Sequence, residues 1–165
     1  MKRILAAVES DALQARVART AAELARALGA ELNLCHVMPE ADYEEIQSHL
    51  ELRHERPFSI THAEDWARGG GQAAADALGR PAPHAVGLVG QPADEILELA
   101  ERIGAELIVL GFEGLHGLGK LRALGSVSRQ VMERARCPVV VVPLGRELAA
   151  TPVATRTALA AYRII

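Results

Sequence analysis

Five short apolar segments recur along this chain of 165 residues, and helix signals fill the stretches between them. Apolar segments of this length are typical of strands that are buried on both faces of a sheet. Strands that alternate with helices form a parallel sheet, because the chain must cross a face of the sheet before the next parallel strand can begin. The sequence therefore predicts an α/β fold with helices on both faces of one parallel sheet, whose strands are Ile4–Val8, Leu32–Val37, Ala85–Val89, Leu107–Leu110 and Val139–Val142.

The first helix is predicted from its ends and from its apolar spacing. Ser10 or Asp11 can cap its start, and Gly29 stands where helices commonly end. Helical spacing then gives an inward-facing stripe of Val17, Ala21, Leu24 and Leu28.

The later helices are defined in the same way. Gly90-Gln91-Pro92 opens one helix, which Gly104 closes, and the inward-facing residues expected between them are Ile96, Ala100 and Ile103. Another helix is expected at Ser128–Ala135. Between the second and third strands we expect an acidic helix at Tyr43–Leu52, a helix start at Thr61, and a helical piece at Gln72–Leu78.

Composition excludes several classes of partner. The net charge of −3 disfavours nucleic acid and anionic lipid, and no apolar run is long enough to cross a membrane. The apolar part of the N-terminal segment is too short for a signal peptide. Cys35 and Cys137 lie in or beside predicted strands without C-x-x-C spacing, which is typical of reduced, buried thiols. We therefore expect a soluble, cytoplasmic protein.

Catalytic and metal-binding signatures are weak. The spacing of His49, His54 and His62 matches no metal site, so no metal is expected there. No nucleophilic triad and no Walker lysine motif is found, and Ser10 and Ser126 are better explained as helix caps than as nucleophiles. An enzymatic role is not expected, although slow hydrolysis of bound ATP stays open.

The most informative stretch is the glycine-rich segment Gly111–Val127, which follows one predicted strand and precedes a helix. Glycines let a backbone approach a phosphate closely, and the first turn of a helix supplies unpaired N–H donors. The alternative is a crossover turn that binds nothing. His116, within this segment, can contact a phosphate or lie on the loop surface. Glu9 follows the first strand, so Glu9 and the glycine segment face one crevice if the first and fourth strands are neighbours.

These residues resemble the universal stress protein family over positions 1 to about 144. The resemblance is carried by five features in order: the strand ILAAV with Glu9 after it, Cys35-His36-Val37, Gly90-Gln91-Pro92-Ala93, Gly111-x-x-Gly114, and Gly125-Ser126-Val127 with a helix and then CPVVVV. The resemblance implies a Rossmann-like, open five-stranded parallel sheet in the order 3-2-1-4-5. It assigns residues 1–144 to one domain and leaves 145–165 as a C-terminal extension, in which Thr151-Pro152 can start a helix.

The resemblance also implies a ligand and a partner. The ligand is ATP, or ADP or AMP, with or without Mg²⁺. The adenosine would lie against Ala7, Glu9 and the backbone of Val37, the ribose along Leu110 and Gly111, and the phosphates against Gly114, Gly125, Ser126, Val127 and Ser128. The partner is a second copy, paired through Val139–Val142. Edge-strand physics favours the same pairing, and the alternative is that the C-terminal tail covers this strand.

Three features depart from the pattern of the nucleotide-binding branch. Ten residues separate Gly114 from Gly125, where the family pattern has nine. Glu9 replaces the usual aspartate, and Glu113 stands where many members have histidine or arginine. A carboxylate that faced the phosphates would repel them, and Lys120 and Arg122 can offset it. Two functions therefore remain: a nucleotide-binding stress sensor or regulator, and a scaffold that acts through dimerisation and partner binding.

Overall fold

The computed structural model describes residues 2–8, 14–52, 68, 71–79, 83–112 and 126–144, with side chains given from residue 15 to residue 48 in the second range. Its strands form one five-stranded parallel sheet in the order β3-β2-β1-β4-β5, as the family resemblance implies. The sheet is built from β1 (Arg3–Ala7), β2 (Glu31–Met38), β3 (His84–Val89), β4 (Leu107–Phe112) and β5 (Val139–Pro143). The predicted α/β fold with a parallel sheet is confirmed.

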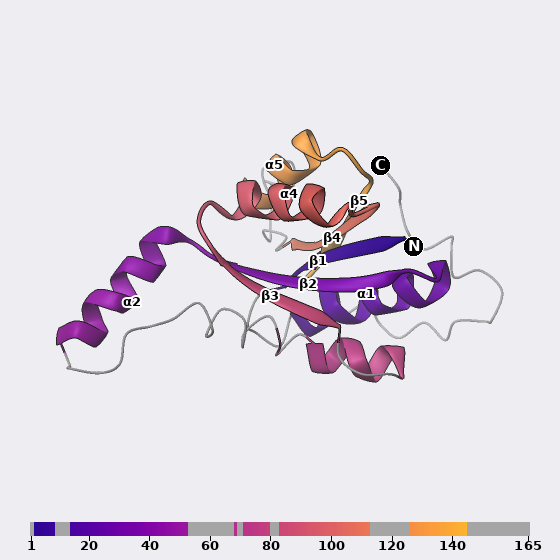
Figure 1. Cartoon of the computed structure of the whole chain (residues 1–165), viewed down its shortest axis with the longest axis horizontal. Coiled ribbons are helices and arrows are strands. Elements are labelled where there is room, and N and C mark those ends of the chain that lie inside the picture. Colours follow the sequence, from indigo (N-terminus) through magenta and orange to yellow (C-terminus); the bar gives the residue numbers. More distant parts are fainter. Residues whose placement is uncertain are drawn as a thin grey trace, which may run out of the picture.

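Helices cover both faces of the sheet (Figure 1). On one face lie α1 (Gln14–Leu28) and a helical segment at residues 71–78, while α4 (Pro92–Ile103) and α5 (Ser126–Arg134) lie on the other. A further helix, α2 (Glu40–Leu52), follows β2 and projects away from the sheet in Figure 1. Among the residues that the structure describes, no helix combines the length and apolar character needed to cross a bilayer.

The face of α1 that meets the sheet is built from small side chains. Five of its residues are fully buried: Val17, Ala18, Ala21, Ala22 and Ala25. Leu24 packs against them, but Leu28, which we predicted to face inward, is 47% exposed. The prediction for Leu28 was wrong because the last turn of α1 reaches the amino edge of the sheet, where β2 begins three residues later. Alanines at the contact allow the helix backbone to approach the strands closely.

The opposite face carries a second cluster of buried side chains, contributed by the sheet, α4 and α5. Its members include Leu5, Cys35, Ile96, Leu99, Ile108 and Val131. The central strand β1 contributes Ile4 and Ala6 to the α1 face and Leu5 to the α4 face, and all three are buried. Burial on both faces explains why this strand is apolar at successive positions rather than alternating.

Most predicted element ends are reproduced to within one residue, but β4, α5 and α2 differ, and α2 begins at Glu40 rather than at the predicted Tyr43. Gly104 closes α4 in the left-handed conformation, with φ of 63°, as its position predicts. However, β4 continues two residues beyond Leu110, so Gly111 belongs to the strand and not to the loop. In addition, α5 starts at Ser126, two residues earlier than expected, which makes Ser126 part of the helix. The predicted helix start at Thr61 and the extension at 145–165 lie outside the described residues.

Candidate functional site

The strand order reverses between β1 and β4. The chain builds β2 and β3 on one side of β1, then returns to place β4 and β5 on the other. The carboxyl ends of the two central strands lie side by side, with Ala7 opposite Leu110. Open parallel sheets bind ligands beyond the carboxyl ends of their strands at such a reversal. The first and fourth strands are therefore neighbours, which was the condition for a shared crevice.

The structure describes seven of the ten residues that the sequence assigned to this crevice: Ala7, Val37, Leu110, Gly111, Ser126, Val127 and Ser128. Glu9, Gly114 and Gly125 lie outside the described residues, as do Glu113, His116, Lys120 and Arg122. Leu110 is buried in the cluster beneath α4 and α5, and Ala7, Val37 and Val127 pack against that same cluster. The structure thus brings these four apolar positions to one face of the sheet.

The link between β4 and α5 is a hydrogen bond at the end of the sheet. The Ser128 hydroxyl donates to the carbonyl oxygen of Gly111 at 2.9 Å, across 17 positions of sequence. Ser128 is buried, whereas Ser126, two residues earlier, is exposed. The two serines that the sequence grouped together therefore have different surroundings.

The end of β1 is fixed by bonds to β2. The Val8 N–H donates to the Cys35 carbonyl at 2.8 Å, and Nδ1 of His36 donates to the Val8 carbonyl at 2.9 Å. His36 is 7% exposed, so its ring is buried and bonded at the strand end, as expected for a boundary histidine. These bonds fix the end of β1 to β2 as far as Val8, the last described residue before Glu9.

A close approach that the sequence analysis did not identify lies at the neighbouring strand end. The Gly90 N–H donates to the Met38 carbonyl at 3.0 Å, which ties the end of β3 to the end of β2. Gly90 has a φ of 154°, and a Cβ there would lie 2.6 Å from Oε1 of Glu95. The positive φ therefore favours glycine where α4 begins, whereas the Glu95 side chain is flexible and can move aside. The Gly-x-Pro pattern marked the turn, but only the folded chain places Glu95 over it.

Helices α4 and α5 are also joined by an ion pair. Nη1 of Arg134 lies 2.6 Å from Oδ1 of Asp94, and both side chains are about half exposed. The sequence assigned Asp94 only a favourable place in the first turn of α4. No local pattern relates residues 40 positions apart, so this contact was not predictable.

Neither cysteine is suited to chemistry at the crevice. Cys35 pairs with Ala7 across the strands, and burial raises the pKa of its thiol to about 12. Burial also raises the pKa of Cys137 from its usual value. Both thiols therefore remain protonated near neutral pH. Since the thiolate is the reactive form, neither cysteine is a ready nucleophile. Within the described ranges, no group of three or more His, Cys, Asp or Glu residues is placed to hold a metal ion.

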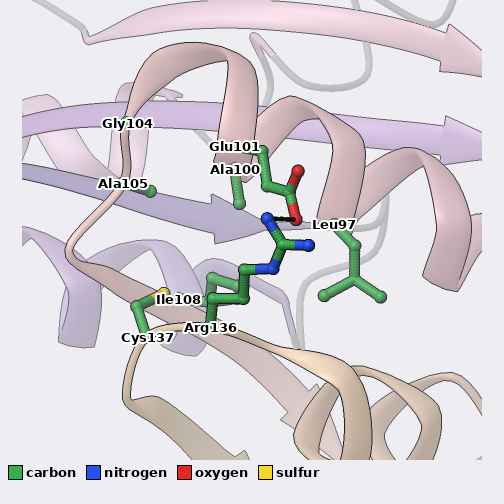
Figure 2. Close-up of a pocket in the computed structure, with 8 residues that line it drawn as sticks. All are labelled: Leu97, Ala100, Glu101, Gly104, Ala105, Ile108, Arg136 and Cys137. Carbon is green, nitrogen blue, oxygen red and sulfur yellow. Dashed lines mark ion pairs between the residues drawn. The ribbon is translucent and has the colours of Figure 1, made fainter.

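A small cavity lies at the opposite, amino-terminal edge of the sheet (Figure 2). Its volume is about 120 Å³, and its walls include Leu97, Ala100, Ile108 and Cys137. Figure 2 shows Arg136 extended across it toward Glu101, to which Nη1 is paired at 3.3 Å. Pockets for drug-sized ligands are roughly 300–1,000 Å³, so this cavity is too small for a nucleotide. It is separate from the strand ends at Ala7 and Leu110, neither of which lines it.

Comparison with known proteins identifies the family. Residues 1–143, which are most of the chain, match the model of the Universal stress protein family. The chain belongs to the universal stress protein family. A universal stress protein of Thermus aquaticus, named for its place in the QAH/OAS sulfhydrylase 3′ region, is 36% identical over 86% of this chain and 98% of its own length. A shorter match, 49% identical over 59 residues, covers 36% of this chain and 34% of universal stress protein MJ0531 of Methanocaldococcus jannaschii.

Solved universal stress proteins share the fold. The structure of UspA from Lactobacillus plantarum is 26% identical, with a TM-score of 0.60, over 86% of this chain and 97% of that one. A universal stress protein crystallised in complex with cAMP has a TM-score of 0.58 and 21% identity, over 87% of this chain and 98% of its own. At 21% identity, the similarity to the structure with cAMP shows only that the two proteins share a fold.

Proposed function

We propose that this universal stress protein binds ATP or a related adenine nucleotide at the carboxyl ends of β1 and β4. Through the bound nucleotide the protein would act as a sensor or regulator in the stress response, and Mg²⁺ would bind together with the phosphates. We place it in the cytoplasm, where free thiols such as Cys35 and Cys137 stay reduced. The proposed nucleotide-binding domain is residues 1–144, followed by an extension at 145–165.

One observation carries the proposal: the first turn of α5 is hydrogen-bonded to the end of β4, beside the end of β1. The N–H groups of a helix start are unpaired within the helix and favour anions. In this arrangement phosphates would meet α5 near Ser126, and the nucleoside would lie toward Ala7, Glu9 and Val37. The solved universal stress protein that shares this fold and was crystallised with cAMP lends support, because cAMP is an adenine nucleotide.

The first test asks whether the purified protein already contains a bound adenine nucleotide. Heat denaturation should release an adenine nucleotide that elutes with a standard on an anion-exchange column. If the protein is purified free of ligand, titration calorimetry with ATP and Mg²⁺ should give a saturable heat with a stoichiometry of about one per chain, a Kd of 1 mM corresponding to about −4 kcal/mol. No released nucleotide together with no heat at millimolar ATP would rule out the proposal.

The alternative is a scaffold that acts without nucleotide, through dimerisation and partner binding. Three sequence features favour it: the ten residues between Gly114 and Gly125, the carboxylate of Glu9, and the carboxylate of Glu113. Each would place bulk or negative charge toward a nucleotide site. The same calorimetric titration separates the two functions, because the scaffold predicts no heat with ATP.

We further propose that the protein is a homodimer paired through Val139–Val142. Strand β5 pairs with β4 on one side, and a valine strand with an open second side tends to pair with another strand. The Leu144 N–H donates to the Phe112 carbonyl, so by alternation the N–H of Val142 faces β4 and that of Val141 faces outward. Pro143, which has no N–H, also occupies an outward position, as edge strands allow.

The V141P variant tests the dimer. It removes an outward donor and leaves the bonds to β4 in place, so we expect a folded monomer where the wild type sediments as a dimer. The matched variant V142P removes a bond to β4 and is expected to lower thermal stability instead. A wild-type protein that is monomeric at all concentrations in sedimentation velocity would contradict the proposed pairing and favour coverage by the C-terminal tail.

A further inference from the structure

The two serines at the start of α5 differ in what their hydroxyl groups can do. Ser128 is 4% exposed, and its hydroxyl proton is donated to the Gly111 carbonyl at 2.9 Å. A hydroxyl has one proton, so Ser128 cannot donate to a phosphate while that bond is made. Ser126 is exposed at the first position of the helix, and among the described residues its hydroxyl has no such assigned role in the packing of the sheet.

The direction of the Gly111 carbonyl explains the bond. Successive carbonyls of a strand point to opposite sides, and the Phe112 carbonyl accepts the Leu144 N–H on the β5 side. The Gly111 carbonyl therefore points toward β1, whose pairing with β4 reaches only Ala7 opposite Leu110. Beyond that pair, the Gly111 carbonyl accepts the Ser128 hydroxyl. The bond thus lies at the strand reversal, beside the end of β1.

The other contacts that hold α5 are either apolar or exposed to solvent, and one of them, the packing of Val127 against the cluster beneath α4 and α5, also lies in the first turn. Val131 is fully buried against the sheet, and Arg134 pairs with Asp94 where both side chains are about half exposed. Exposed ion pairs contribute little to stability, whereas loss of one partner of a buried hydrogen bond leaves the other group unsatisfied. Among the contacts between described residues, the bond from Ser128 is therefore the polar one that joins the first turn of α5 to the sheet.

We propose that Ser128 is a positioning residue: its bond to Gly111 holds the first turn of α5 against the end of β4, so that the helix N–H groups and the Ser126 hydroxyl meet the ligand. This assigns phosphate contact to Ser126 and removes it from the Ser128 side chain. The proposal rests on the proposed function for its ligand, but the restraint itself is a property of the protein without ligand.

The test compares S128A, S128T and S126A in the full chain without nucleotide and then with it. In the ligand-free protein, amide hydrogen exchange at residues 130–132 of α5, whose N–H groups bond back to the carbonyls of the first turn, should rise about five- to twentyfold in S128A, as expected for the loss of one part-buried hydrogen bond. Exchange in β1 should be unchanged, S126A should match the wild type, and S128T, which keeps the hydroxyl, should restore most of the protection.

The binding step uses ATP and adenosine as probes. S128A should raise the Kd for ATP by about tenfold and leave the Kd for adenosine unchanged, because only the phosphates contact the start of the helix. S126A should weaken the binding of ATP without altering amide exchange in the ligand-free protein. A residue with a purely structural role would be expected to change both. Unchanged exchange in ligand-free S128A would overturn the restraint, whether or not nucleotide binds. If the wild type binds no nucleotide, the proposed function fails and the exchange result alone decides the role of Ser128.

Discussion

Replacing Leu34 with alanine is expected to destabilise the protein by about 2–5 kcal/mol, the usual range for truncating a buried leucine. Leu34 is fully buried in β2, on the face that meets α1, where alanines hold the helix close to the strands. Close packing leaves the neighbours little room to fill the cavity. For a chain of this length, thermal unfolding monitored by circular dichroism should show a melting temperature lower by about 4–20 °C.

The matched control is L28A, which removes the same atoms from the last turn of α1. Leu28 is 47% exposed, so its truncation should change the free energy of unfolding by no more than about 0.5 kcal/mol. Comparable losses in the two variants would mean that the end of α1 is covered by chain that the described residues do not include, and that Leu28 belongs to the core after all.

Replacing Gly125 with valine is expected to raise the Kd for ATP by about 10- to 100-fold. This corresponds to a loss of roughly 1–3 kcal/mol of binding free energy, caused by steric overlap at a close contact. Gly125 lies outside the described residues, immediately before Ser126, the first residue of α5. In the proposed site its backbone approaches the phosphates, where only glycine leaves the space. The measurement is the Kd for ATP and Mg²⁺ by calorimetry.

The control for this variant is G119V, in the same glycine-rich segment but outside the family motif. It should leave the Kd for ATP close to the wild-type value, and both variants should retain the wild-type circular dichroism spectrum. If G125V binds ATP as the wild type does, the phosphates are held elsewhere and the assigned cradle is wrong. Equal loss in both variants would indicate a general effect of bulk in the loop.

The sequence alone determined the architecture. Successive apolar positions such as Ile4, Leu5 and Ala6 are typical of a strand buried on both sides, and the intervening helix signals indicated that the sheet is parallel. Residue types with special backbone requirements located the turns, as Gly104 shows. The family resemblance then gave the strand order, and with it the meeting of the strand ends at Ala7 and Leu110.

Only the tertiary structure decided which side chains do what at those ends. Helical spacing placed Leu28 on the inner face, but spacing carries no information about where the sheet stops, and Leu28 is exposed. The sequence treated Ser126 and Ser128 as two equivalent hydroxyls. Burial and the bond to Gly111 distinguish them, because a hydrogen bond across 17 positions depends on how β4 and α5 meet in space and not on any local pattern.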